Sequence, residues 1–325
     1  MRRLTVQPAA SEPLEIGTAC VAVSSWAYDA GLLKTAVAFA HVAARVLPDD
    51  PEVAFGVARA TRDSGRFGHA DAWFQRALGL ARRARNAEIK ARVYIGWGLL
   101  DEMRAAEVAA KVKFEKALAT ATAASLPSIA AHAHQFMIPF GTLSDGFAHA
   151  VAAAQLYAPD DLNLPRLASD TGALFSEHGH FSVALTLYEA ARPFLVRTAD
   201  LVACYANIGR ASAALGLKQR FTEAWTEVER LSRAPIAQFY ADSLIELATG
   251  AVTLRYWKYA AKMTAEARAV AGQLGGVRTL RKAEELASCI DHRSGGDTDR
   301  PPDPRLEEFT ADLCQRLSAL RNTSN

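Results

Sequence analysis

The segment SGRFGHADAWFQRALGL, residues 64–80, decides the fold. It places Gly65 ahead of Phe67, and then sets the small residues Ala70 and Ala77 on either side of the aromatic Phe74. From Phe67 onward the intervals are three or four residues, so these side chains share one face of a helix. Alanine on that face lets two helix backbones approach closely, and a phenylalanine one turn away fills the remaining space. The segment therefore predicts a helix packed tightly against others.

The same offsets recur along the chain. They appear in residues 104–118 (RAAEVAAKVKFEKAL) as Ala110, Phe114 and Ala117, in residues 178–191 (HGHFSVALTLYEAA) as Gly179, Phe181, Ala184, Tyr188 and Ala191, and earlier as Gly31, Leu33, Ala36, Ala40, Ala43 and Pro48. Aligning these positions gives repeats that begin near residues 17, 51, 91, 131, 165, 205 and 241. Self-similarity at this period predicts an array of stacked helix pairs.

The repeat resembles the tetratricopeptide (TPR) family, whose second helix carries an alanine, a phenylalanine four positions on and a small residue three positions later. Gly98 and Gly172 also stand where the first helix of that family has its close-contact glycine. The resemblance covers about residues 17–275. It implies an all-α fold, an α-solenoid in which antiparallel helix pairs form a right-handed superhelix with a concave groove. The sixth repeat, GLKQRFTEAW at residues 216–225, predicts a longer turn between its helices.

The two ends differ in composition from the repeats. Residues 1–15 are predicted to be a flexible arm, and residues 16–292 to be the array, whose last helix over residues 275–292 caps it. Residues 293–304 are rich in Gly, Asp and Pro and predict a linker. Residues 305–325 predict an amphipathic helix and a short tail, with an apolar stripe of Leu306, Phe309, Leu313, Leu317 and Leu320.

This apolar stripe must be buried against another surface, and the sequence leaves three possible surfaces open. The helix can fold back on its own array as a second cap, pair with the same helix of a second chain, or occupy the groove of its own array as an autoinhibitory plug.

Composition excludes several classes of partner. Half of the residues are hydrophobic, 22% are charged, and the formal net charge is +2, so no strong basic field exists to hold nucleic acid or an anionic membrane. No export signal follows the N-terminus, and prolines and histidines interrupt the uncharged stretch at residues 117–144. The four cysteines lack metal or disulfide spacing. We expect a cytoplasmic protein with free thiols.

The sequence lacks the motifs of catalysis. It contains no phosphate-binding loop, no serine nucleophile elbow and no zinc-protease helix motif. His132 and His134 are two residues apart and would point to different faces of a helix, while His178 and His180 lie in a predicted turn. We therefore predict no enzyme activity, no cofactor and no metal.

The resemblance implies which side chains face the groove, because four positions of each first helix point into it in the TPR family. By register, the candidate partner-binding residues are Phe55, Arg59, Arg62, Arg92, Ile95, His132, Gln135 and Arg166. The arginines and His132 can bind the carboxylates of an acidic peptide, with Phe55 and Ile95 as apolar contacts. Phe55 and Arg59 occupy positions where the family's carboxylate clamp needs other residues, so docking to chaperone C-termini is not implied.

Two functions follow as hypotheses. The first is a non-catalytic scaffold or adaptor that binds a protein or peptide segment along the groove, as the resemblance implies. The second is a regulatory sensor in which a ligand or peptide changes the pitch of the superhelix and switches the C-terminal helix.

Overall fold

The computed structural model describes residues 13–232, 240–274 and 276–323. Every regular element over these residues is a helix, and no strand occurs among them, which confirms the predicted all-α class. The first twelve residues of the predicted N-terminal arm lie outside this description. Its last three residues are helical, because the first described helix begins at Pro13.

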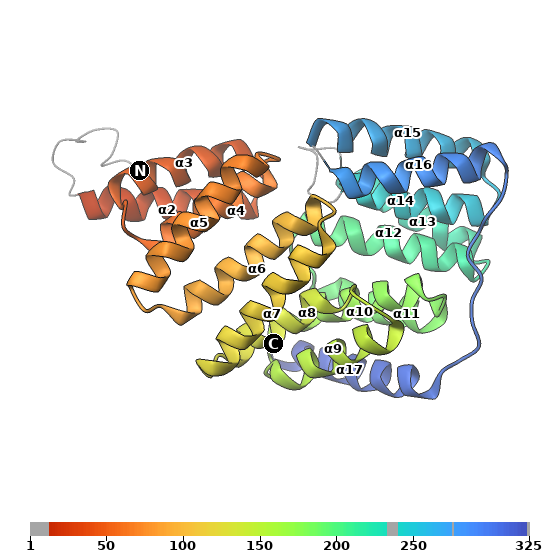
Figure 1. Ribbon diagram of the computed structural model, residues 1–325. Helices are drawn as coiled ribbons and strands as arrows, with labels where there is room; N and C mark the ends of the chain where they lie inside the picture. Colours follow the sequence, from red (N-terminus) through yellow and green to blue (C-terminus); the bar gives the residue numbers. More distant parts are fainter. Residues whose placement is uncertain (1–12, 233–239, 275, 324–325) are drawn as a thin grey trace. The chain divides into compact units, whose positions relative to one another are not determined.

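The chain divides into two compact units, residues 1–129 and residues 130–325. The described part of the first unit consists of helix pairs that pack in sequence order (Figure 1). The helices are α2 (Pro13–Asp29) with α3 (Leu33–Val46), α4 (Pro51–Asp63) with α5 (Phe67–Arg83), and α6 (Ala87–Met103) with α7 (Glu107–Ala123).

The second unit continues with the same kind of pairing. Its helices are α8 (Pro127–Met137, which begins just before the boundary), α9 (Leu143–Leu156), α10 (Leu164–Glu177), α11 (Phe181–Ala191), η2 (Arg192–Phe194), α12 (Thr198–Ala214), α13 (Lys218–Leu231), α14 (Tyr240–Thr253), α15 (Trp257–Leu274), α16 (Val277–Asp291) and α17 (Pro304–Thr323). The predicted capping helix corresponds to α16, and the predicted C-terminal helix to α17.

The core of each pair is the small–aromatic–small pattern that the sequence displays. Phe74, Phe114 and Tyr188 are completely buried, as are the alanines on either side of each of them. A methyl group built on Gly98 would lie 2.5 Å from Cε1 of Phe114, and one on Gly172 would lie 2.7 Å from Cε1 of Tyr188. In these two pairs the first helix thus has glycine where the aromatic ring of the second helix presses against its backbone.

Most turns inside the pairs share one geometry. In the second repeat the backbone N–H of Arg66 donates to the carbonyl of Thr61 at 3.1 Å, and in the sixth the N–H of Leu217 donates to the carbonyl of Ser212 at 2.8 Å. Gly65 has a φ of 77° and the glycine of the sixth turn a φ of 73°. These are Schellman-type helix ends. The sixth repeat therefore has the ordinary short turn, and the sequence-based expectation of a longer one was wrong.

Side-chain caps fix where several first helices begin. The carboxylate of Asp50 accepts hydrogen bonds from the backbone N–H groups of Glu52 and Val53, so α4 starts directly after it. Asn86 accepts from the N–H of Ile89 at 2.9 Å and starts α6 in the same way. Each cap satisfies donors that a helix N-terminus leaves open.

Candidate functional site

A hollow lies on the first unit, on the side formed by the first helices of its pairs. It is lined by Ser24, Ser25 and Tyr28 of α2, Glu52, Phe55 and Arg59 of α4, and Arg92 of α6, among others. The space open to water in it is about 70 Å³. That volume holds a few water molecules or the tip of one side chain. Three of the predicted groove residues therefore meet at one place.

Arg59 is the unusual member of this hollow. Its guanidinium carbon lies 4.2 Å from the centroid of the Tyr28 ring, in a cation–π arrangement. Its Nε is buried and has no hydrogen-bond partner within the described part of the chain. A buried donor without an acceptor is costly, so an acceptor brought to this nitrogen would be stabilised.

Arg92 faces the same hollow but is already paired. Its guanidinium carbon lies 5.2 Å from the Phe55 ring centroid, and its Nη1 lies 3.0 Å from Oε1 of Glu52 and 3.7 Å from Oε1 of Glu88. Its side chain and both carboxylates are partly exposed, so the pairs are screened by solvent. Arg92 can exchange a partner at low cost.

Arg62 does not reach the hollow. Its side chain is buried, with Nε 2.6 Å from Oδ1 of Asp63 and Nη1 donating to the carbonyl of Gly96 at 3.2 Å. The Tyr28 hydroxyl donates to the other oxygen of Asp63. Burial lowers the pKa of Arg62, but Asp63 outweighs it and raises the pKa overall, so the guanidinium stays charged. Arg62 thus helps to fix the ring on which Arg59 stacks.

Two predicted apolar contacts differ in their surroundings. Phe55 lines the hollow and lies 6.4 Å from the Phe74 ring, whereas Ile95 is buried and is not among the lining residues. Phe55 is the apolar contact that the hollow offers.

The remaining predicted groove residues form a second cluster, in the second unit. Gln135 is buried, donates to Oδ2 of Asp170 at 2.6 Å and accepts from the Tyr157 hydroxyl at 2.7 Å. The His132 ring lies 5.6 Å from the Tyr157 ring, and Nε of Arg166 lies 3.9 Å from Oδ2 of Asp200. Burial raises the pKa of Asp170, against the lowering effect of Arg166. Gln135 therefore makes hydrogen bonds inside the core, and the Arg166 side chain remains partly exposed to solvent.

The C-terminal stripe is covered by its own chain. Leu306, Leu313, Leu317 and Leu320 are buried in the core cluster of the second unit, and the Phe309 ring packs edge-on against the ring of Phe147 at 5.4 Å. Arg316 donates to the carbonyls of Ala154 and Tyr157 at 2.6 and 3.0 Å. These are carbonyls at the C-terminal end of α9, where a cation is favourable. Of the three possible surfaces, the structure has the helix folded back on its own array.

The segment that leads to α17, residues 294–303, is held along the way and is here called the strap (Figure 1). Asp299 accepts from the N–H groups of Phe181 and Ser182 at the start of α11. The N–H of Arg300 donates to the carbonyl of Gly179 at 2.8 Å. Sequence reasoning identified this segment only as a linker.

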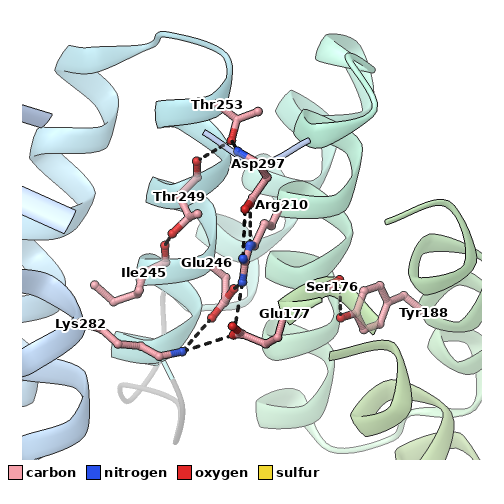
Figure 2. A network of polar contacts seen from close by, with 10 residues as sticks. All are labelled: Ser176, Glu177, Tyr188, Arg210, Ile245, Glu246, Thr249, Thr253, Lys282 and Asp297. Atoms are coloured by element: carbon pink, nitrogen blue, oxygen red, sulfur yellow. Dashed lines mark hydrogen bonds and ion pairs between the residues drawn. The ribbon is translucent and has the colours of Figure 1, made fainter. Parts of the chain in front are cut away.

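The strap also meets a charged network around Arg210 of α12 (Figure 2). The Arg210 guanidinium contacts Asp297 of the strap at 2.8 Å, Glu246 of α14 at 2.8 Å and Glu177 of α10 at 3.4 Å. Lys282 of α16 lies 3.6 Å from both glutamates. Burial lowers the pKa of Arg210, but the carboxylates outweigh it and raise the pKa overall. One guanidinium thus joins three first helices to the strap.

Two further observations concern metal and membrane. Within residues 13–232, 240–274 and 276–323, no three His, Cys, Asp or Glu side chains gather to hold a metal ion. Nδ1 of His134 lies 2.9 Å from Nδ1 of His149. None of the helices that the structure describes is long and apolar enough to cross a membrane.

Successive antiparallel helices carry buried alanines around an aromatic ring, and two of the pairs place glycine against that ring. The repeats are TPR-like. No protein-family model matches the sequence. No curated protein matches it.

Three solved structures have a backbone trace similar to that of this chain. BtubC (BKLC) from P. vanneervenii has 15% identity and a TM-score of 0.46, over 69% of this chain and 90% of that one. Yeast Tom70 has 13% identity and a TM-score of 0.38, over 98% and 79%. The TPR2AB domain of yeast Sti1, solved in a complex with pHSP90, has 14% identity and a TM-score of 0.32, over 85% and 99%. Likenesses at this level do not indicate what this chain binds.

Proposed function

We propose that this protein is a non-catalytic scaffold or adaptor whose first unit binds a protein or peptide segment that carries acidic side chains. The observation that carries the proposal is the buried Nε of Arg59 in the hollow at α2, α4 and α6, which has no hydrogen-bond partner among the described residues. The proposed site is the hollow itself, with Arg59 as its central contact and Arg92 and Phe55 on its wall.

A carboxylate is the group that fits this site. The charged side chains of the lining are Glu52, Arg59 and Arg92, which leave one positive charge, and Glu52 already faces Arg92. The two oxygens of one carboxylate accept from Nε and one Nη of the same guanidinium, which satisfies the open donor and the charge at once when the Arg59 side chain turns its buried Nε toward the hollow. The Tyr28 ring holds the guanidinium in place, so little side-chain entropy is lost on binding.

A segment of chain fits better than a small molecule. The hollow has room for the tip of one side chain, and its walls come from three successive first helices and from α3. A peptide that crosses these helices can place one acidic side chain at Arg59 and lay its apolar neighbours on Phe55. Affinity then comes from repeated contacts along the helices, with the hollow as an anchor.

The test is affinity capture from the native lysate with the wild-type chain and with the variants Arg59→Glu and Lys111→Glu. The second is the matched control, because Lys111 is an exposed residue of α7 in the same unit and undergoes the same change of charge. A charge-assisted hydrogen bond is worth about 1.5–3 kcal/mol, so the loss of Arg59 should weaken a captured partner by roughly 10- to 100-fold. Circular dichroism checks that both variants are folded. Partners retained equally by all three proteins would refute the site.

A further inference from the structure

The C-terminal tail, meaning the strap together with α17, docks on the second unit much as a separate ligand would. Its partners are far away in sequence: Asp299 binds the start of α11, 117 or more residues earlier, and Arg316 binds the end of α9, about 160 residues earlier. Between them the leucines of α17 pack into the core formed with α10 and α11. The docking surface is therefore complementary to this tail along its whole length.

A pair of glycines precedes every one of these contacts. Gly295 and Gly296 are adjacent and have φ values of 88° and 129°, a backbone region that glycine enters without strain. The first side chain that the strap uses for docking, Asp297, follows directly. Rotation at the two glycines can send the tail in another direction while leaving each of its own docking groups unchanged.

Release of the tail leaves no uncompensated buried charge in the network. Arg210 and Lys282 supply two positive charges, and Glu177 and Glu246 supply two negative charges, so these four balance without Asp297. The apolar consequence is different. Release exposes the leucine stripe of α17 and the surface under it, and both then need a new cover.

We infer that this docking surface is also an interface between copies of the chain, which exchange tails through the hinge at Gly295 and Gly296. The tail of each chain lies on α9, α11 and Arg210 of the other. Every contact that the tail makes from Asp297 onward re-forms in the exchanged dimer, so the new costs are those of association and of the changed backbone at the two glycines, and concentration shifts the balance. The occupant is a second copy because the surface matches this particular order of acidic strap and leucine stripe.

The experiment uses the full chain and two variants that each carry one added cysteine, Ser182→Cys at the docking surface and Arg300→Cys on the tail. Both residues are exposed, and the strap contact next to each uses a backbone N–H. The variants are mixed, incubated at high concentration and treated with a short bismaleimide. The parent chain, which has its four native cysteines, is the control. The double variant shows that the linker spans the two positions within one chain.

We expect a cross-linked dimer in the mixture, beyond what either single variant or the parent gives alone. Sedimentation velocity should show the dimer fraction of the wild-type chain rising over about a hundredfold range of concentration. A mass that stays monomeric throughout overturns the inference. So does a dimer whose mixed variants give no cross-link while the double variant links internally, because its interface would then lie elsewhere.

Discussion

Replacing Gly98 by alanine tests the close contact on which the repeats depend. The added methyl group would lie 2.5 Å from Cε1 and 2.9 Å from Cδ1 of Phe114, a ring that is fully buried and has no room to withdraw. Overpacking of this kind costs about 1–3 kcal/mol. Alanine in place of a helical glycine returns up to about 1 kcal/mol through the lower backbone entropy of the unfolded chain. The net change for Gly98→Ala is therefore a loss of about 0–3 kcal/mol.

Gly56→Ala in α4 is the matched control, because nothing lies within 4 Å of its added methyl group. The helix-propensity gain is common to both variants, so Gly98→Ala should be less stable than Gly56→Ala by about 1–3 kcal/mol. Urea unfolding followed by far-UV circular dichroism measures the midpoints, and hydrogen exchange in α6 and α7 assigns the effect to this unit. The reasoning is refuted if Gly98→Ala is at least as stable as Gly56→Ala.

Two other predictions concern the second unit. Leu313→Ala should destabilise this unit by about 2–5 kcal/mol, because the side chain is completely buried, whereas Asp312→Ala on the exposed face should change it by less than about 0.5 kcal/mol; equal unfolding midpoints would contradict the packing of α17. Burial, and then the neighbouring His149, lower the pKa of His134 below its ordinary value of 6.5, so the unfolded chain binds more protons in acid and stability falls as the pH drops through and below about 6.5. The difference between the unfolding midpoints at neutral and acidic pH should be smaller for His134→Phe than for the wild-type chain. An equal difference in the two proteins would exclude the His134 imidazole as the cause of the loss of stability in acid.

The sequence predicts the helix pairs well because their contacts are local. The spacing of Ala70, Phe74 and Ala77 reports a helix face directly, and burial of that face needs only the next helix in the chain. The prediction of a longer turn in the sixth repeat was wrong because turn length is poorly marked in the sequence. A short turn of this type needs only a residue in the left-handed αL conformation, here glycine. The other residues of the loop can be of almost any type, so they carry little information about its length.

The register predicts on which side of a helix a residue lies but not whether its side chain is exposed. The register places both Arg59 and Arg62 on the inner side of α4, yet Asp63 draws Arg62 into the interior while Arg59 remains at the hollow. The contacts of the strap could not be predicted from the sequence. Its contacts with Arg210 and the start of α11 join segments more than eighty residues apart, and no local periodicity marks them.

The path of the strap changes how the C-terminal end of the array comes apart. In a plain stack of helix pairs the last pair frays first, since only one neighbour holds it. Here the same extended segment ties Thr253, at the end of α14, to Arg210 and to the turn before α11. Fraying of the terminal helices must therefore strip a tether that reaches two pairs inward, and this end should open in one cooperative step rather than helix by helix.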